Sequence, residues 1–241
     1  MKKNSKSLLL IIIFLLFFLL GGLFYFLYRF PVGDGWDFRN NLWSPAYLLI
    51  HGQNPYDIKR LFPDSNAIWL PPVIGIFSFL GLFTFDTART LWLLINMIAF
   101  FTACFLMIHP IHSPNEFIWL IFLALFPSTI INFTMGQFSI MSVFLMLLLA
   151  RLHHHLPLWA KGVIIALLFA KPQLIIFSLP VFLYHLTLEK GFKTTLIQTA
   201  WIIAGVTASS LPLFFEGHHW ASQLFANLRE NSQWLQPNIS S

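Results

Sequence analysis

The sequence has little charge and only one cysteine in its 241 residues. Charged residues make up 10% of the chain and hydrophobic residues 57%, an apolar share well above that of a soluble domain. Cys104 lies inside an apolar stretch, which excludes a disulfide framework and a cysteine-based metal site. No internal repeat or appended soluble domain is present. The composition therefore predicts an all-α, polytopic helical membrane protein surrounded by membrane lipids.

The formal net charge of +5 does not indicate a nucleic-acid partner. The basic residues form short clusters between apolar stretches, where membrane topology explains them. Three lysines precede an apolar run that is too long for a signal-peptide core and has no small-residue cleavage site after it. We therefore expect residues 1–7 in the cytoplasm and an uncleaved first span over 8–30. An outer loop over 31–70 would follow, in a multi-pass protein of a bacterial inner membrane.

The remaining apolar stretches predict a helical bundle over 71–215, in a single transmembrane domain that ends in an outer tail, 216–241. The stretches are 71–85, 88–108, 117–133, 138–152, 162–186 and 195–215. The basic clusters all reach the cytoplasmic side only if 71–85 is a re-entrant or interfacial segment. Lys171-Pro172 interrupts 162–186, which favours two short tilted helices. This topology predicts that Asp34, Asp37, Gln137, Lys171 and the tail share the outer face.

The outer loop carries signals of a short helix. Ser44-Pro45 is typical of an N-cap followed by proline at the first helical position, and Gly52 is typical of a helix end. The residues between them form an apolar stripe that Phe38 and Leu42 extend upstream. We interpret this segment as a helix on the membrane surface that holds Asp37 at the depth of lipid headgroups.

Several motifs in this order resemble glycosyltransferase family 87. They are Asp37-Phe38, Leu48-Leu-Ile-x-Gly-x-Asn-Pro-Tyr-Asp57, Trp69-Leu-Pro-Pro72, Arg89-x-Leu-Trp-x-x-x-Asn96, Met135-Gly-Gln-Phe-Ser139 and the apolar run from Gly162 to Lys171-Pro172. The resemblance implies a C-type membrane glycosyltransferase, mannosyltransferase-like, that takes a hexose such as mannose from a polyprenyl-phosphate sugar. Arg-Asn-Asn follows Asp37-Phe38 where family members have an aromatic-rich run. Family members also continue through further spans, so we expect this chain to be an N-terminal fragment.

The resemblance assigns the general base to Asp37, and the chemistry of the residues agrees. A base must take the proton from the acceptor hydroxyl, on a lipid or a glycan, as the anomeric carbon is attacked. Lys171 would receive the charge of the leaving lipid phosphate, so the mechanism requires no metal and no cofactor beyond the lipid-linked donor. Gln137, Asp34, Asn54 and Tyr56 complete the candidate substrate-binding set. The alternatives are a helix cap for Asp37, snorkelling to the interface for Lys171 and a turn position for Gln137.

Counted from Lys161, Lys171 has risen only about 15 Å, or half of a bilayer of about 30 Å. We therefore expect a water-accessible cavity or local thinning of the bilayer at the site. The run His153-His154-His155 suggests a metal site. However, adjacent residues on a helix point in different directions, so we interpret the run as the basic cytoplasmic end of a span.

Two other functional classes compete with the enzyme. Charge within the membrane and broken helices also occur in transporters, although this chain has no matched halves with breaks at corresponding positions. A truncated, inactive relative or a non-catalytic membrane subunit would carry the same motifs. An in-frame downstream coding sequence with further spans would identify the chain as a fragment.

Overall fold

The computed structural model describes residues 18, 21–22, 25, 35–108, 122–123, 126–215 and 219–234. Residues 1–7, Asp34 and most of the predicted first span lie outside this set. Every regular element in the described part of the chain is a helix, as the composition predicts. The elements are α2 (Trp36–Phe38), η1 (Arg39–Trp43), α3 (Ser44–Ile50), η2 (Ile58–Arg60), α4 (Pro71–Ile76), η3 (Ser78–Leu82), α5 (Phe85–Ile108), α7 (Pro127–Met135), α8 (Ser139–Leu152), α9 (Leu158–Leu168), α10 (Pro172–Lys190), α11 (Phe192–Phe214) and α12 (His219–Trp234).

Three of the described helices, α5, α10 and α11, are long and apolar enough to cross a membrane. Helices α7 and α8 form a fourth candidate that is bent by 109° between them. The outer face of α10 is apolar yet exposed, as expected of a helix surrounded by lipid: Phe177 is 77% exposed and Leu188 67%. The protein is therefore an all-α, polytopic membrane protein.

Two breaks predicted from the sequence are present. The stretch 71–85 does not form one spanning helix, because it divides into α4 and the 3₁₀ helix η3, of six and five residues. The stretch 162–186 is interrupted at residues 169–171, between α9 and α10. The re-entrant course of 71–85 through a bilayer stays a prediction.

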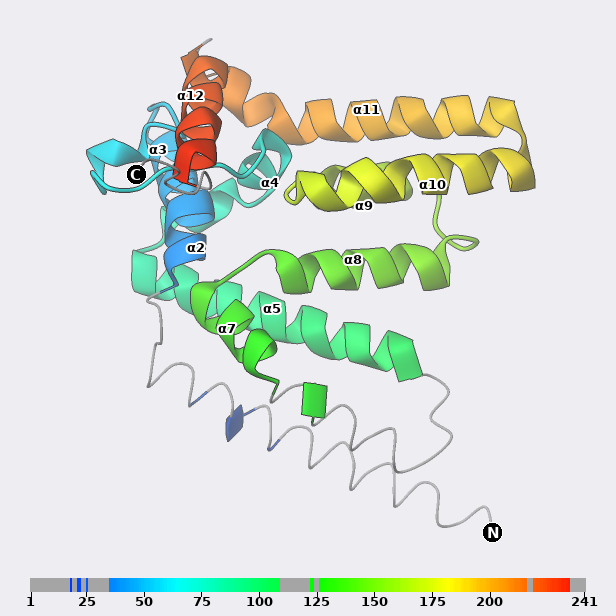
Figure 1. The fold of residues 1–241 in the computed structure, drawn as a ribbon, viewed down its shortest axis with the longest axis horizontal. Coiled ribbons are helices and arrows are strands. Elements are labelled where there is room, and N and C mark those ends of the chain that lie inside the picture. The colour runs from blue at the N-terminus through cyan, green and yellow to red at the C-terminus, as the bar shows by residue number, and fades with distance from the viewer. Residues whose placement is uncertain are drawn as a thin grey trace, which may run out of the picture.

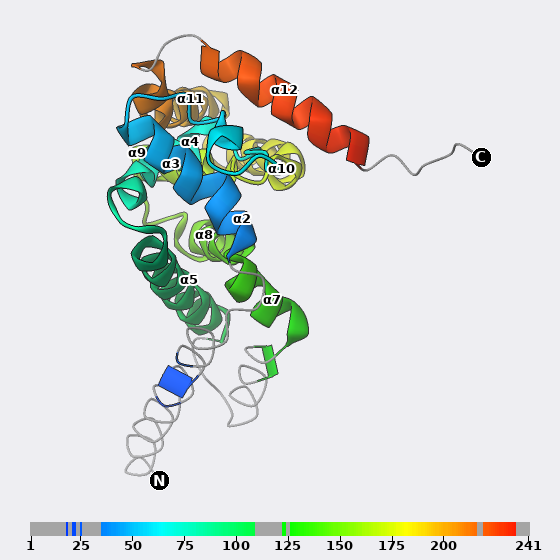
Figure 2. The same ribbon diagram turned by 90° about the vertical axis from the view of Figure 1, so that its left-hand side faces the viewer.

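Helices α5, α8, α9, α10 and α11 lie side by side with their long axes horizontal in Figure 1. One end of this bundle, which we call the loop end, carries the turns at 136–138 and 169–171, together with the segment 35–70. The other end, which we call the histidine end, carries the turns at 153–157 and 189–191. Figure 2 views the bundle from the loop end, with α2, α3 and α12 in front. Among the described residues, the basic ones predicted to be cytoplasmic thus gather at the end away from Asp37: Arg151, Lys161, Lys190 and Lys193.

The bundle is tightly packed where α9 meets α11. A Cβ atom placed on Gly162 would lie 2.5 Å from the backbone oxygen of Trp201, so only glycine allows the two backbones this approach. Small residues serve the same purpose where helices pack within membranes. This contact fixes α9, and with it the 169–171 turn that carries Lys171.

The helix of the outer loop begins earlier than predicted. Residues 36–50 are continuously helical, and Ser44 has αR dihedral angles inside the segment instead of capping it. The predicted N-cap at Ser44 is therefore wrong. Phe38 and Leu42 are fully buried, and their burial stabilises helix upstream of the proline. Gly52 does end the helix, with φ of 67°.

The apolar stripe of this helix packs inside the protein. Ala46 is fully buried, and Gly81 of η3 lies so close that an added Cβ would sit 2.5 Å from the Ala46 carbonyl. Position at the membrane surface stays a prediction, but the stripe contacts protein. The aromatic residues expected at the interface are on other faces: Trp36 is 46% exposed, and Trp43 and Tyr47 are half-buried.

Helix α12 covers the second half of the outer loop. Asn227 is 1% exposed, and its Nδ2 donates to the carbonyl oxygens of Tyr56 at 2.9 Å and Ala67 at 3.0 Å. Lys59 forms an ion pair of 2.8 Å with Glu230. The described part of the predicted tail is thus an ordered helix that holds the loop at the loop end of the bundle.

Candidate functional site

Asp37 lies in the first turn of α2, directly after Gly35 reverses the chain with φ of 62°. The N-cap position belongs to Gly35, and no side chain caps this helix by a hydrogen bond. Asp37 therefore does not act as the N-cap of this helix, which was the alternative to its role as a base. Its half-buried carboxylate accepts a hydrogen bond of 3.1 Å from Asn41 Nδ2.

Asn41 is a site residue that the sequence reasoning missed. It lies one turn after Asp37, inside the π-helical turn η1, and is 2% exposed. Its Oδ1 accepts a hydrogen bond of 2.9 Å from the backbone N–H of Ile68, while its Nδ2 holds Asp37. The spacing of four residues on a helix was the available signal.

The Gly136-Gln137 turn lies against Phe38. Gly136 ends α7 with φ of 68°, and a Cβ added there would lie 2.5 Å from the Cβ of Phe38. The carbonyl of Gly136 accepts a hydrogen bond of 2.9 Å from Trp92 Nε1, which fixes the turn to α5. The backbone N–H of Gly35 also donates to Thr134 at 3.1 Å. The Asp-Phe and Gly-Gln motifs, almost 100 residues apart in sequence, therefore form one contact.

Gln137 is oriented toward Asp37 by this arrangement. Ser139 Oγ, at the start of α8, donates to Gln137 Oε1 at 3.3 Å. The side-chain amide of Gln137 is then available as a donor, and its interaction with the Asp37 carboxyl group lowers the pKa of that group. A role for Gln137 beyond its position in the turn stays a prediction.

A group of stacked aromatic rings packs against the segments that carry Asp37 and Gln137. Phe38 stacks on Trp92 with ring centroids 5.8 Å apart, and Trp92 stacks on Phe138 at 6.0 Å. Trp69 meets Phe138 edge to face at 5.5 Å. All four residues are at least 95% buried. Phe38 and Phe138, which directly follow Asp37 and Gln137 in the sequence, are therefore held in a rigid apolar layer.

Lys171 completes the group from the α9–α10 turn. It occupies the N-cap position of α10 with φ of −120° and ψ of 81°, and Pro172 follows at the first helical position. Its side chain is half-buried, and its charge acts on the Asp37 carboxylate. Lys171 thus lies near enough to Asp37 to lower the pKa of its carboxyl group, although no ion pair between the two side chains is among the described contacts. A shared site for Asp37, Gln137 and Lys171 stays a prediction.

The environment raises the pKa of Asp37 above its ordinary value of 3.8. Burial is the largest cause, because it disfavours the charged carboxylate. Attraction to Lys171 and hydrogen bonds from Asn41 and Gln137 oppose it, but they do not cancel it. A carboxylate with a raised pKa is a stronger base than a solvated aspartate, and the hydrogen bond from Asn41 orients it.

The other predicted site residues are not part of this group. Asp34 lies outside the described residues. Asn54 Oδ1 accepts a hydrogen bond of 3.0 Å from the Tyr56 N–H, a turn contact. Tyr56 is 1% exposed, its hydroxyl donates to the Trp69 carbonyl at 2.9 Å, and burial raises its pKa. Substrate binding by Asn54 and Tyr56 stays a prediction, and their observed contacts are structural.

The distance of Lys171 from the histidine end of the bundle depends on the helix along which it is measured. Helix α10 has 19 residues, so Lys171 lies about 28 Å from Lys190 along its axis. Helix α9 has only 11 residues, and counting along it gives the shallower rise of about 15 Å expected from the sequence. Counted along α10, this distance nearly matches a bilayer of about 30 Å, and the expected cavity or local thinning of the bilayer stays a prediction.

The helical interpretation of His153-His154-His155 is wrong. Helix α8 ends at Leu152, and the three residues form a turn. Because the backbone turns there, the rings of His153 and His154 approach to 3.6 Å between centroids instead of diverging. Both face Glu189 at the end of α10.

Comparison with known families identifies the chain. The sequence profile described as glycosyltransferase family 87 matches residues 70–241, which is most of the chain. The chain belongs to glycosyltransferase family 87. It is therefore a membrane glycosyltransferase, and the transporter alternative has no support. The comparisons with curated proteins and with solved structures give no match.

The family match includes Gln137 and Lys171 but begins after Asp37. Family membership and the geometry around Asp37 are thus two separate observations. The two are connected by one contact: the Gly136-Gln137 turn lies inside the matched region and packs against Phe38, which lies outside it.

Proposed function

We propose that this family 87 member transfers a hexose from a polyprenyl-phosphate sugar to an acceptor hydroxyl, with Asp37 as the general base. One observation supports the proposal: the segments that carry Asp37, Gln137 and Lys171 all end at the loop end of the bundle, and Gln137 and Lys171 both lower the pKa of the Asp37 carboxyl group. A carboxylate, an amide donor and a cation at one site are the groups that such a transfer requires.

In the proposed reaction the acceptor oxygen attacks the anomeric carbon, and its proton passes to an Asp37 carboxylate oxygen. The bond between the anomeric carbon and the phosphate oxygen breaks, and the lipid phosphate leaves with the bonding electron pair. Lys171 receives the charge that develops on that phosphate. Asn41 and Gln137 hold the carboxylate in the orientation for proton transfer.

Donor binding would strengthen the base. Without donor, the charge of Lys171 stabilises the ionised carboxylate of Asp37. A phosphate bound to Lys171 adds a negative charge near Asp37 and competes for the same cation, and both effects raise the pKa of Asp37. Asp37 thus becomes more basic when the sugar is in place.

The loop end would face the extracytoplasmic side of a bacterial inner membrane, and the histidine end the cytoplasm. The basic residues gathered at the histidine end support this orientation. The acceptor would be a lipid or glycan hydroxyl at the outer surface. No metal enters the proposed steps, because Lys171 supplies the positive charge.

The donor class can be tested with the purified chain in lipid nanodiscs. Radiolabelled polyprenyl-phosphate mannose, polyprenyl-phosphate glucose and the matching nucleotide sugars would each be offered with an acceptor lipid extract. Transfer from a lipid-linked sugar alone is the expected result. Equal transfer from nucleotide sugars would contradict the donor assignment. Absence of transfer from every donor would favour the inactive-relative alternative.

A further inference from the structure

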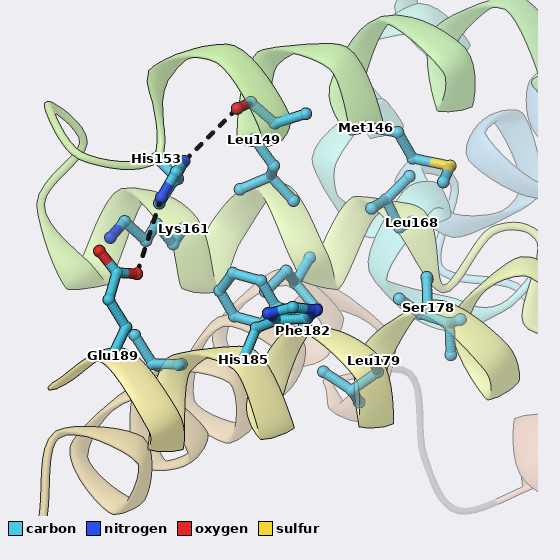
Figure 3. Close-up of a pocket in the computed structure, with 14 residues that line it drawn as sticks. Met146, Leu149, His153, Lys161, Leu168, Ser178, Leu179, Phe182, His185 and Glu189 are labelled. Atoms are coloured by element: carbon cyan, nitrogen blue, oxygen red, sulfur yellow. Dashed lines mark hydrogen bonds and ion pairs between the residues drawn. The ribbon is translucent and has the colours of Figure 1, made fainter. Parts of the chain in front are cut away.

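The histidine end of the bundle contains a group of potential metal ligands that the proposed transfer reaction does not use. His153 and His154 come from the turn after α8, and Glu189 comes from the end of α10. One ligand atom from each residue can be chosen so that all three lie within 4.8 Å of one another. Figure 3 shows His153 and Glu189 on opposite sides of a pocket, facing each other across its mouth.

We propose that His153, His154 and Glu189 bind a zinc-type divalent cation that fastens α8 to α10. Two imidazoles and a carboxylate are a ligand set that Zn²⁺ accepts, with water at the fourth position. The site lies at the other end of the molecule from Asp37. It is a structural site, and it does not depend on the proposed transfer reaction.

The spacing of the ligand atoms suits this ion. Tetrahedral bonds of about 2.0–2.1 Å place neighbouring ligand atoms about 3.3–3.4 Å apart. His154 Nδ1 lies 3.5 Å from Glu189 Oε1, and His153 Nε2 lies 3.9 Å from Glu189 Oε2. The three ligand atoms lie within 4.8 Å of one another, so shifts of up to about 1.5 Å, within the reach of exposed side chains, would close the site.

The surroundings of His153 also favour the tautomer that can bind a metal through Nε2. Its Nδ1 lies 3.4 Å from the carbonyl oxygen of Ala150, which can only accept a hydrogen bond. Nδ1 therefore carries the proton, and the lone pair of Nε2 faces Glu189. Metal-binding histidines commonly donate their other ring N–H to such a carbonyl, which orients the ring.

The pocket explains what the ion would do. Its volume is about 360 Å³, and its walls are mostly apolar residues of α8, α9 and α10, among them Leu149, Ile165 and Phe182. Lys161 of α9 also lines it, and the charge of Lys161 acts on Glu189. Because this space separates α8 from α10, a cation bound by residues on both sides would bridge the pocket mouth. Lys190, 3.7 Å from Glu189 Oε1, competes for the same carboxylate, but it is half-exposed and can turn into water.

Metal titration of the purified chain, carrying a tag without histidine, tests the proposal. Zn²⁺ would be titrated against a fluorescent chelator, and Co²⁺ would report tetrahedral coordination through its visible absorption. We expect one ion per chain. His153→Ala and Glu189→Gln should each weaken Zn²⁺ binding by at least tenfold and abolish the Co²⁺ band. Glu189→Gln keeps the shape of the side chain, so its effect does not depend on refolding.

His155→Ala is the matched control. His155 belongs to the same turn and is exposed, but it is not one of the three ligands. This variant should bind Zn²⁺ as the unchanged chain does. Weakening by His155→Ala equal to that by Glu189→Gln would show diffuse binding to surface histidines and overturn the proposal. Binding of no stoichiometric ion by the unchanged chain would also overturn it. Neither result bears on sugar transfer, which is assayed separately.

Discussion

The amide of Asn41 donates a hydrogen bond of 3.1 Å to the carboxylate of Asp37, one helical turn before it. The same amide accepts the N–H of Ile68, which leads into the Trp69-Leu70-Pro71-Pro72 segment. One side chain thus connects the proposed base to the segment at which the family match begins. This connection makes the position of Asp37 a consequence of the fold and gives substitutions there specific expected outcomes.

Replacing Asp37 with asparagine should remove the base and leave the fold intact. Sugar transfer should fall by roughly 10²–10⁴-fold, the usual range of acid–base catalysis. Asp64 is an exposed residue of the same loop, so Asp64→Asn should leave the transfer rate unchanged. Asp34→Asn should lower the transfer rate much less than Asp37→Asn does. Initial rates with saturating donor, measured on equal amounts of inserted protein, would check this. Full activity of the Asp37 variant would assign the base elsewhere.

The raised pKa of Asp37 should be visible in the pH dependence of both activity and stability. Activity requires the ionised form, so kcat/KM should fall with decreasing pH at a pH above the 3.8 of an ordinary aspartate. Because the folded pKa lies above the unfolded one, ionised Asp37 destabilises the folded state. Asp37→Asn should thus raise the melting temperature above the folded pKa, and the gain should vanish below pH 3.8. A constant gain at all pH values would contradict this.

Lys171 should affect the use of the lipid donor. Lys171→Met removes a charge-assisted contact worth roughly 1.5–3 kcal/mol, so the donor KM should rise roughly 10- to 150-fold. Lys171→Arg should retain part of the affinity, because arginine also binds phosphate. Donor titrations of both variants would distinguish these outcomes. A normal donor KM for the methionine variant, with normal insertion, would leave Lys171 as a snorkelling residue.

Gly136→Ala should damage both stability and transfer, because the new Cβ would meet Phe38 at 2.5 Å and displace the residue next to Asp37. Gly191→Ala is the matched control. Gly191 also has a positive φ, 83°, but no atom lies within 4 Å of an added Cβ. The ψ of Gly191, 164°, lies in a region essentially confined to glycine, so Gly191→Ala carries backbone strain at least as large as that of Gly136→Ala, and only Gly136→Ala has the clash. Thermal melts and transfer rates of the pair would separate the two effects, and equal losses of transfer would argue against the Phe38 contact.

The two ends of the bundle should lie on opposite sides of the membrane. Asp86 is exposed at the loop end and His155 at the histidine end. Single cysteines at these positions, in a chain with Cys104 replaced, should react differently with an impermeant thiol reagent added from outside. We expect labelling at 86 and protection at 155. The reverse pattern would overturn the proposed orientation.

The sequence predicted the breaks in the helices better than their beginnings. Lys171-Pro172 marks a true interruption, because Lys171 has non-helical dihedral angles and Pro172 occupies the first position of α10, where its missing N–H costs no hydrogen bond. Ser44-Pro45 carries a similar local signal, yet the chain is helical on both sides of it. There the burial of Phe38 and Leu42 outweighs the local preference, and the π-turn η1 immediately precedes the proline-containing turn. Burial depends on distant segments, which a local pattern does not contain.

The proposed base, amide and cation were predicted as a group because charge sorting placed their segments at one face. Asn41 was not, although its spacing from Asp37 is a local feature. Its importance comes from the bond to Ile68, a contact across 27 residues. The histidine run was set aside for a different reason. The predicted stretch 138–152 ends where α8 ends, but the argument against the run assumed helical geometry at 153–155, where the chain forms a turn.

The unequal arms of the α9–α10 hairpin have a consequence for the surrounding lipid. Helix α9 has 11 residues and α10 has 19, so α9 is about 12 Å shorter. Trp159 and Val163 of α9 are 56% and 40% exposed, so this short helix presents apolar side chains outward. A hydrocarbon layer of about 30 Å exceeds the length of α9, which predicts a hydrophobic mismatch on this flank of the described bundle. We expect lipid headgroups there to dip toward the turn at 153–157, so that the bilayer is thinner beside the helix that leads to Lys171.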